Sequence, residues 1–368
     1  MKYWWLALGL AAACRSAPSA TGPAHWRLVE EFRLGTRDEG PASFGDVRGL
    51  LVDRREQIWV LDFSTQDIRV FDSTGKHLRT IGRRGKGPGE FEYADGLAQA
   101  GDGTIWVDDP MNQRLAVFSE DGRSLRQVPN LTFGYGYAWP GGADTAGRVW
   151  ADFGAPGKDR WTQLRFRRFT ASGQADTVDG PVCKWPGDPQ ATIIRGHGGG
   201  MQIPFLPNAV RAVDFNGRFA CIPSSDHYIG YITSLNGRDT LTRFSLPGGP
   251  IPVRAAEHDS AVHRLLDFAK QVKAERAEAS MVPTTKPAIE SMFFDNQGHL
   301  WVRRITSRDS AEFDVIDAGG RVIGIVASPF RPTHFRPQFR NDRIYFIGQG
   351  EDDVPQIVRT RLIKSSVP

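Results

Sequence analysis

The chain has 368 residues, of which 40% are hydrophobic and 24% are charged, and this composition excludes disordered and collagen-like proteins. Its 46 Lys and Arg residues against 42 Asp and Glu give a net charge of +4. That balance does not favour nucleic-acid binding, which needs basic side chains gathered on one face. The 40 glycines, 24 prolines and 22 phenylalanines favour strands joined by turns.

The first residues, MKYWWLALGLAAAC, are typical of an export signal, because a basic residue is followed by an apolar run and by small residues before Cys14. The apolar run is too short to span the roughly 30 Å of a bilayer core as a helix. The Ala-Ala-Ala-Cys ending resembles the lipobox of bacterial lipoproteins, which implies that Cys14 is lipidated. An ordinary cleaved signal and a cytosolic protein with an apolar start are the alternatives. Residues 15–25 are small and polar, as expected of a flexible tether.

An internal repeat begins soon after the tether. A shift of 47 residues places Arg48–Ile81 on Asp95–Val128 without a gap, so that Ile-Trp-Val and Val-Phe recur in register. Each unit is predicted to contain four short strands, because four runs of strand-forming residues alternate with turn residues. The same combination of a turn and a strand returns four more times, at Asp144, Asp214, Asp295 and Arg340.

Six units predict an all-β fold, a six-bladed β-propeller of four-stranded antiparallel blades within a single domain at 26–368. One four-stranded sheet cannot cover both of its faces, whereas a closed ring of sheets can. The segment HWRLVEEFRLG, which starts at His25, has strand character but belongs to no unit. We expect this N-terminal strand to complete the last blade and so close the ring.

The repeats resemble those of NHL-type six-bladed propellers, which carry G-x-G-x-G-x-F, then D-x-x-G-x-I-W-V-x-D, then V-F-D-x-x-G. The resemblance extends over nearly all of residues 26–363, although units three, four and six are degenerate. Members of related six-bladed families include lactonases and lyases that use metal ions, and some NHL-type proteins bind RNA.

The stretch TIGRRGKGPGEFEYADG at 80–96 is rich in glycine and basic residues, so a phosphate-binding loop must be considered. Such loops lead into a helix whose amides face the anion, whereas here one predicted strand precedes the stretch and another follows it. We therefore predict a connector between blades, with Phe91 inserted between them and the three arginine and lysine side chains available as a contact surface.

The predicted connections differ in length between the two ends of the ring. The turns within blades are minimal, whereas long insertions fall in the connections between blades, which emerge at one end. Function usually lies on loops held by a rigid scaffold, so we predict that the site lies at this loop-rich end. The residues at the start of the innermost strands should line the tunnel mouth as ligand-binding residues, namely Arg48, Asp95, Arg211, Glu290 and Arg336.

Alternating charges around a small opening suit a zwitterionic or polar ligand. An equally valid interpretation is a ring of ion pairs that only plugs the hole. A second set of charged residues follows the second strand of several units, and we expect its aspartates, Asp62, Asp109 and Asp152, to hold loop amides.

Two insertions are unusual. Residues 254–280 have apolar side chains at spacings of three and four and should form a helical insertion between blades 4 and 5, either as a lid over the site or as a helix packed on the rim. Glycines surround His197 in the earlier insertion, and His227 lies in a loop at the same end. Both histidines are candidate ligand-binding residues. Because no spacing enforces metal ligation, no metal site or cofactor is predicted.

If Cys14 carries lipid, Cys183 and Cys221 are the two cysteines left. They form a disulfide candidate in an oxidising compartment, and a pair of buried thiols is the alternative.

The preferred hypothesis is a non-catalytic exported protein, anchored in the cell envelope by its N-terminal lipid, that binds a protein, peptide or glycan across the loop-rich end. No cluster of nucleophile, base and orienting residue is visible, so no catalytic residue is assigned. The alternative is a metal-dependent propeller hydrolase or lyase, similar to lactonases, with its site at the tunnel mouth. Binding of RNA would require contact with the cytosol, which export argues against.

Overall fold

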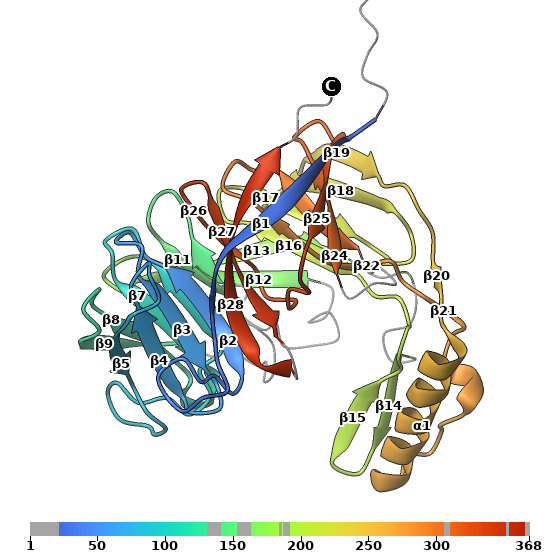
Figure 1. The fold of residues 1–368 in the computed structure, drawn as a ribbon, viewed down its shortest axis with the longest axis horizontal. Helices are drawn as coiled ribbons and strands as arrows, with labels where there is room; N and C mark the ends of the chain where they lie inside the picture. The colour runs from blue at the N-terminus through green and yellow to red at the C-terminus, as the bar shows by residue number, and fades with distance from the viewer. Residues whose placement is uncertain are drawn as a thin grey trace, which may run out of the picture.

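The computed structural model describes residues 22–130, 141–152, 163–183, 186, 192–304, 310–350 and 353–364. These residues form six four-stranded antiparallel blades arranged in a ring (Figure 1), as predicted. Blades 1 to 3 consist of β2 (Val47–Val52), β3 (Ile58–Asp62), β4 (Asp67–Phe71) and β5 (His77–Ile81); β6 (Gly96–Gln99), β7 (Ile105–Asp109), β8 (Arg114–Phe118) and β9 (Ser124–Pro129); and β10 (Gly142–Ala143), β11 (Val149–Asp152), β12 (Gln163–Phe169) and β13 (Ala175–Val182).

Blades 4 to 6 follow the same order, with the innermost strand first. They consist of β16 (Val210–Asp214), β17 (Arg218–Ile222), β18 (Ile229–Ser234) and β19 (Thr240–Ser245); β22 (Ile289–Phe294), β23 (Leu300–Arg304), β24 (Ala311–Ile316) and β25 (Val322–Ser328); and β26 (Gln338–Arg340), β27 (Arg343–Gln349), β28 (Pro355–Lys364) and β1 (Ala24–Leu34).

A repeated hydrogen bond from a Trp indole to an Asp carboxylate fixes the first turn of several blades. In blade 1, Asp53 accepts hydrogen bonds from the amides of Arg55 and Gln57 and from Trp59 Nε1, at 2.8–2.9 Å. The same six-residue spacing joins Asp144 to Trp150 in blade 3 and Asp295 to Trp301 in blade 5. One carboxylate therefore closes the turn and orients a large inward side chain, because buried polar groups need partners.

The blades are held together by apolar side chains. Each of the six interfaces between neighbouring blades contains one buried apolar cluster, including the interface between blade 6 and blade 1. The ring is therefore closed, as the repeat predicted. Between blades 3 and 4 the apolar cluster is supplemented by a disulfide that joins Cys183 to Cys221, with their Cα atoms 5.7 Å apart.

The N-terminal strand completes blade 6, as predicted. Strand β1 pairs antiparallel with β28 from Trp26↔Lys364 to Leu34↔Ile357. It also pairs parallel with β25 of blade 5 from Ala24 to Arg27, which the repeat did not predict. Because the strand begins at Ala24, residues 24 and 25 belong to blade 6 rather than to the expected tether.

Two insertions form a unit that we call the appendage, residues 192–206 and 251–286. It contains the hairpin β14 (Ile193–Gly196) and β15 (Gly199–Gln202), the pair β20 (Ile251–Pro252) and β21 (Thr285–Lys286), the helix α1 (Ala255–Gln271) and the 3-10 helix η3 (Ala279–Met281). A second 3-10 helix, η1 (Pro110–Asn112), lies in blade 2.

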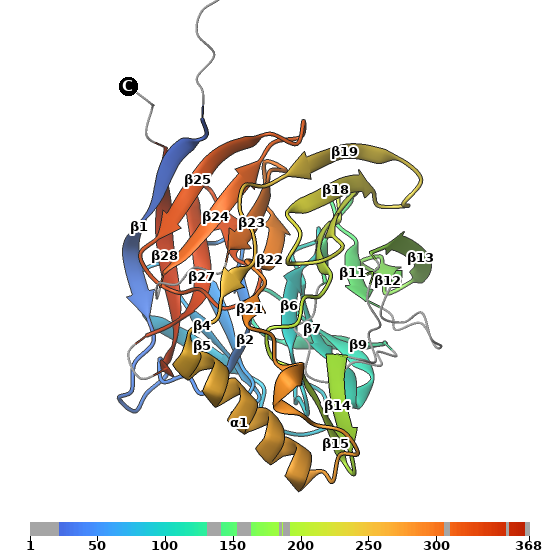
Figure 2. The same ribbon diagram turned by 90° about the vertical axis from the view of Figure 1, so that its right-hand side faces the viewer.

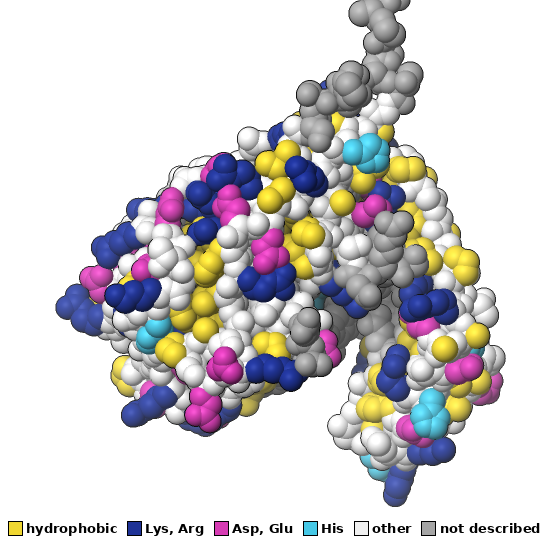
Figure 3. All heavy atoms as spheres, in the orientation of Figure 1, with side chains coloured by type: hydrophobic (Ala, Val, Ile, Leu, Met, Phe, Trp, Pro, Cys, Tyr) yellow, Lys and Arg dark blue, Asp and Glu magenta, His cyan; other side chains and the backbone are white. Residues whose placement is uncertain are grey.

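Helix α1 confirms the predicted helical insertion but ends nine residues early, because Lys273 adopts a left-handed φ of 51° just after it. Its buried residues Ala261, Leu265 and Ala269 pack against the hairpin in a core of their own. The backbone approach is close enough that a Cβ on Gly196 would clash with the carbonyl oxygen of Val272. The appendage therefore extends from the ring as a separate lobe (Figures 1 and 3).

The two ends of the ring differ. Connections between blades, including both parts of the appendage, emerge at the end that we call the loop-rich face. The short first turns of the blades emerge at the opposite end, which we call the turn face.

Strand β1 starts near the C-terminus, far from α1 (Figure 2). Lys, Arg, Asp and Glu side chains are mixed over the visible surface (Figure 3). Within the described residues, no helix is both long and apolar enough to cross a membrane.

Candidate functional site

Buried charges at the loop-rich face hold the connections in place. Asp62 accepts hydrogen bonds from the amides of Gly45, Asp46 and Ser64 at 2.9–3.1 Å, as expected for the aspartates that follow the second strand. Asp109 likewise accepts hydrogen bonds from the amides of Glu92 and Tyr93. The side chain of Asp152 lies outside the described set.

The glycine-rich stretch at 82–95 is a connector. It joins β5 directly to β6, and Phe91 is fully buried between blades 1 and 2. Arg114 donates to the carbonyl oxygens of Lys86, Gly87 and Glu90 at 2.8–3.2 Å. No helix follows, so the amide arrangement of a phosphate-binding loop is not formed.

The innermost strand of blade 6 is interrupted by a bulge. Before it, the amide of Thr333 donates to Ile347 O at 2.8 Å, and after it Gln338 pairs with Tyr345. Residues 334–337 therefore stand opposite the single residue Phe346 of β27, and the surplus backbone leaves the ladder. Bulges redirect side chains in this way, and Pro337 contributes because it has no N–H to donate.

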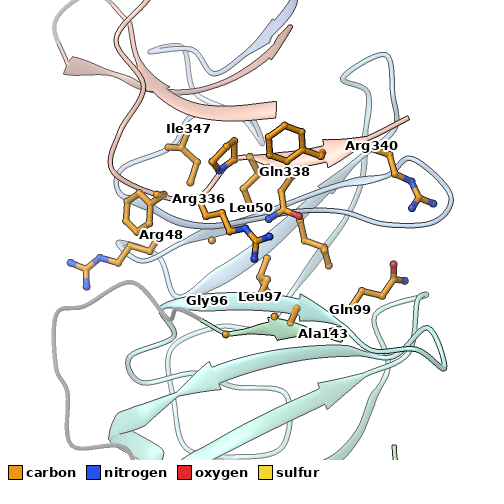
Figure 4. A pocket seen from close by; sticks show the side chains of 18 of the residues that line it. Arg48, Leu50, Gly96, Leu97, Gln99, Ala143, Arg336, Gln338, Arg340 and Ile347 are labelled. Carbon is orange, nitrogen blue, oxygen red and sulfur yellow. The ribbon is translucent and has the colours of Figure 1, made fainter. Parts of the chain in front are cut away.

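The bulge lies beside a cavity of about 430 Å³ in the centre of the ring, which we call the channel cavity (Figure 4). Its walls come from blades 1, 2, 3 and 6 and from the first turn of blade 5, and they include Leu50, Leu97 and Ile347 together with the amides of Gln99, Asn296 and Gln338. Among its described lining residues are three arginines and no Asp or Glu: Arg48, Arg336 and Arg340. The cavity therefore combines apolar walls with polar groups and has a positive electrostatic bias.

Arg336 points into the channel cavity (Figure 4). Its Nη2 lies 3.4 Å from the carbonyl oxygen of Phe294 in blade 5, and it forms no ion pair with any described residue. The side chain keeps contact with solvent inside the cavity although protein surrounds it. Desolvation by the channel walls lowers its pKa, opposed by the charge of Asp214, but that carboxylate is already hydrogen-bonded to Arg218 at 2.6 Å.

Arg48 lies at the wall of the same cavity but is already engaged. Its Nη2 is 2.9 Å from Asp46 Oδ2, and its guanidinium lies 3.3 Å over the ring of Phe63. Its guanidinium is directed away from Arg336 (Figure 4). Of the five residues predicted at the tunnel mouth, Arg48 and Arg336 therefore share the cavity, and only Arg336 turns its charge inward.

The other three predicted tunnel-mouth residues do not line the channel cavity. Asp95 is buried, with 2% of its surface exposed, next to the lining residue Gly96. Arg211 pairs with Cys221 in the ladder of β16 and β17. Glu290 lies 3.2 Å from the buried Arg303, which also donates to Thr333 O at 2.8 Å. Glu290 is therefore part of an ion pair, as the alternative interpretation of the tunnel-mouth charges expects.

His334 is a residue of the bulge that sequence reasoning missed. Its ring stacks on Phe335 with centroids 4.4 Å apart. Desolvation lowers the pKa of His334, with Glu290 opposing that shift and Arg303 adding to it. The signal in the sequence is weak, namely two prolines five residues apart in RPTHFRP.

The two candidate histidines of the loops lie on separate segments. His197 is exposed at the tip of the appendage hairpin, where its amide donates to Val272 O at 2.6 Å. His227 is exposed in the loop between β17 and β18, with Nε2 4.0 Å from Asp226. The described residues contain no group of three His, Cys, Asp or Glu side chains suited to a metal ion. Cys14 and the leader lie outside the described residues.

Comparison with known proteins supports the fold. A family model described as a 6-bladed beta-propeller, DUF5128, matches residues 29–99, from within β1 through blade 1 to the end of β6. No curated protein matches the chain by sequence.

Solved structures match along most of the chain. A DUF4221 family member from Bacteroides vulgatus has a TM-score of 0.54 at 14% identity, covering 94% of this chain and 100% of its own. A protein from Bacteroides fragilis described as exported has a TM-score of 0.50 at 13% identity, covering 95% and 98%. Virginiamycin B lyase from Staphylococcus aureus has a TM-score of 0.43 at 12% identity, covering 92% and 100%. At these identities the likeness is one of fold, and the chain is a six-bladed β-propeller.

Proposed function

We propose that this protein is an exported binding module that holds a protein, peptide or glycan of the cell envelope against its loop-rich face. One observation carries the proposal. Both insertions of the appendage emerge at the same end of the ring, whereas the first turns of the blades at the opposite end are short. A rigid ring that concentrates its insertions at one end is built to present them to a partner.

Export is supported by the leader sequence and by the disulfide. Disulfides persist in oxidising compartments such as the bacterial periplasm and are rare in the cytosol, and Cys183 and Cys221 are bonded. The Ala-Ala-Ala-Cys ending of the leader supports lipidation at Cys14, and the repeats support membership of the NHL-type propellers.

The topology supports a definite orientation for an anchored protein. Strand β1 is the outermost strand of blade 6, so it runs from the turn face to the loop-rich face. A tether attached to Ala24 therefore leaves from the turn face. Anchoring at Cys14 would then hold the turn face towards the membrane and direct the appendage away from it (Figure 2).

Site-specific photo-crosslinking in intact cells tests this role. A photoreactive residue would replace His197 or His227, both exposed at the loop-rich face, or Lys76 or Arg123, both exposed in turns of the opposite face. We expect a discrete crosslinked partner from the first pair only. Equal crosslinking from both pairs, or crosslinking from the turn face alone, would contradict the proposal.

The orientation has its own measurement. A protease added outside spheroplasts or cells should cut the appendage of an anchored protein before any turn of the opposite face, because the appendage projects furthest from the membrane. Cleavage in the reverse order, with the detergent-solubilised protein as the control, would contradict the orientation and leave the binding role standing.

A further inference from the structure

We propose that the channel cavity binds a small organic anion, with a carboxylate group on Arg336 and an apolar body against the surrounding side chains. This site is formed by the inner strands, apart from the exposed surface of the loop-rich face, so the two proposals can fail independently.

The bulge is the first reason for assigning a ligand to Arg336. A regular innermost strand would have continued the ladder with β27, but residues 334–337 leave it and carry Arg336 into the lumen. The backbone hydrogen bonds given up here must be offset by other interactions. Bulges are often found next to functional sites, where they redirect a side chain.

The unmatched charge is the second reason. The guanidinium of Arg336 is exposed to the solvent of the cavity, so its donors are free to bind an anion that enters there. Arg336 has one long contact, 3.4 Å to Phe294 O, and no ion pair within the described part of the chain. Two arginines of the ring that are buried are matched instead: Arg69 lies 3.5 Å from Asp62, and Arg303 lies 3.2 Å from Glu290.

The lining selects the chemical class. An arginine presents a planar fork of donors that fits a carboxylate with two parallel hydrogen bonds. Around it lie Leu50, Leu97 and Ile347, and among the described lining residues the side chains besides the arginines that can hydrogen-bond are amides. A volume of about 430 Å³ lies within the usual range of small-molecule sites. A monocarboxylate with an aliphatic or aromatic body satisfies the charge, the amides and the walls together.

The opposing interpretation is that Arg336 is a structural plug that joins blade 6 to blade 5 across the channel. The two interpretations differ in the unliganded protein. A plug should stabilise the ring, so its removal should lower the unfolding temperature. A ligand-binding arginine that is poorly matched in the free protein should be replaceable by glutamine with little change or a small gain in stability.

The test uses the full exported chain and two pairs of probes, hexanoate with hexanamide and phenylacetate with phenylacetamide. Isothermal titration calorimetry and thermal unfolding would be run on the wild type, on Arg336→Gln and on Arg123→Gln. Arg123 is the matched control because it is an exposed arginine of a turn in blade 2, outside the cavity.

We expect at least one carboxylate to bind the wild type and raise its unfolding temperature, and its amide to bind at least tenfold more weakly. Arg336→Gln should weaken carboxylate binding at least tenfold, while Arg123→Gln should leave it unchanged. The comparison of acid with amide needs only the wild type, so it shows whether binding requires the carboxylate charge even if Arg336→Gln does not fold.

Three results would overturn the proposal. They are failure of both carboxylates to bind at millimolar concentration, equal binding of acid and amide, and undiminished binding to a folded Arg336→Gln. Inorganic sulfate should bind far more weakly than the organic acids. If sulfate matches them and depends equally on Arg336, the cavity is a simple anion site and the apolar part of the proposal is wrong.

Discussion

Reduction of the disulfide gives a quantitative test of how the ring is held between blades 3 and 4. The bond joins Cys183, just after β13, to Cys221 in β17, and the cysteines are 38 residues apart in sequence. In the chain-entropy model, a closed loop of this length destabilises the unfolded state by about 4 kcal/mol at 25 °C. With an unfolding entropy of about 2.1 cal/mol/K per residue over the 368 residues, that corresponds to a shift of roughly 5 °C.

The assay is thermal and urea unfolding of the same protein with and without a reductant that is removed before measurement under argon. Reduction keeps both sulfur atoms in the cluster around Trp150 and Phe219, so packing is preserved. The difference in stability between the oxidised and reduced forms therefore reports the contribution of the covalent bond. A double Cys→Ala variant should lose more, because it also removes buried atoms. Identical unfolding curves for the reduced and oxidised forms would refute the reasoning.

Three further perturbations test other parts of the fold and one tests its pH dependence. Deletion of residues 22–34 removes the strand that completes blade 6, so we expect loss of the cooperative unfolding transition by circular dichroism, whereas a deletion ending before residue 22 should retain it. Arg114→Ala removes three hydrogen bonds to the connector at 82–95 and should speed amide exchange there, with Arg123→Ala as the unaffected control. Leu265→Ala, at a fully buried position of the appendage, should cost about 2–5 kcal/mol locally and expose residues 192–206 and 251–286 to protease while the ring still melts as before. Burial raises the pKa of Asp314 to about 6 from 3.8, so its carboxyl stabilises the folded state below about pH 4 and that contribution is lost as pH rises through about 6. Asp314→Asn should therefore gain stability relative to the wild type on going from about pH 4 to about pH 8, by up to about 3 kcal/mol in urea unfolding, and a constant difference between the two proteins would contradict this sign.

The fold could be predicted because the sequence repeats the local devices that build it. The Asp that accepts a hydrogen bond from the Trp six residues later recurs in blades 1, 3 and 5. In blade 2, Thr104 Oγ1 accepts instead, at 2.9 Å from Trp106 Nε1. These are interactions within one turn, so spacing alone reveals them. The need to bury both faces of each sheet then leads to the ring.

The candidate site could be predicted only in part, because its geometry depends on departures from the repeat. Counting from the repeat placed Arg336 at the start of an innermost strand, and it does line the channel cavity. The same count could not show that a bulge turns Arg336 inward, that Asp46 and Phe63 engage Arg48, or that Arg303 pairs with Glu290. The contacts of Arg48 with Phe63 and of Arg303 with Glu290 join side chains from different strands or connections, which no local spacing encodes.

The position of helix α1 has a similar explanation. Its apolar spacing predicts that one face is buried, but it does not say against what. In the structure that face meets the hairpin of the preceding insertion, through Ile194 and Ile203 against Ala261 and Leu265. Two insertions separated by an entire blade thus cover each other, and the helix does not have to pack on the ring.

The double pairing of β1 bears on both the closure of the ring and the proposed anchor. Close contact with blade 5 depends on Gly324, because a Cβ there would meet the ring of Trp26. From Ala24 to Arg27 the strand is paired to β25, and from Trp26 onward it is paired to β28. A pull from the N-terminus therefore acts first on Ala24 and His25, which are held by blade 5, and then on Trp26 and Arg27, which are held by both blades. Because the pull is along the direction of the strand, several hydrogen bonds share the load instead of opening one at a time. In a protein anchored only through its N-terminus, this arrangement would keep blade 6 intact under such a pull, and closure of the ring depends on that blade.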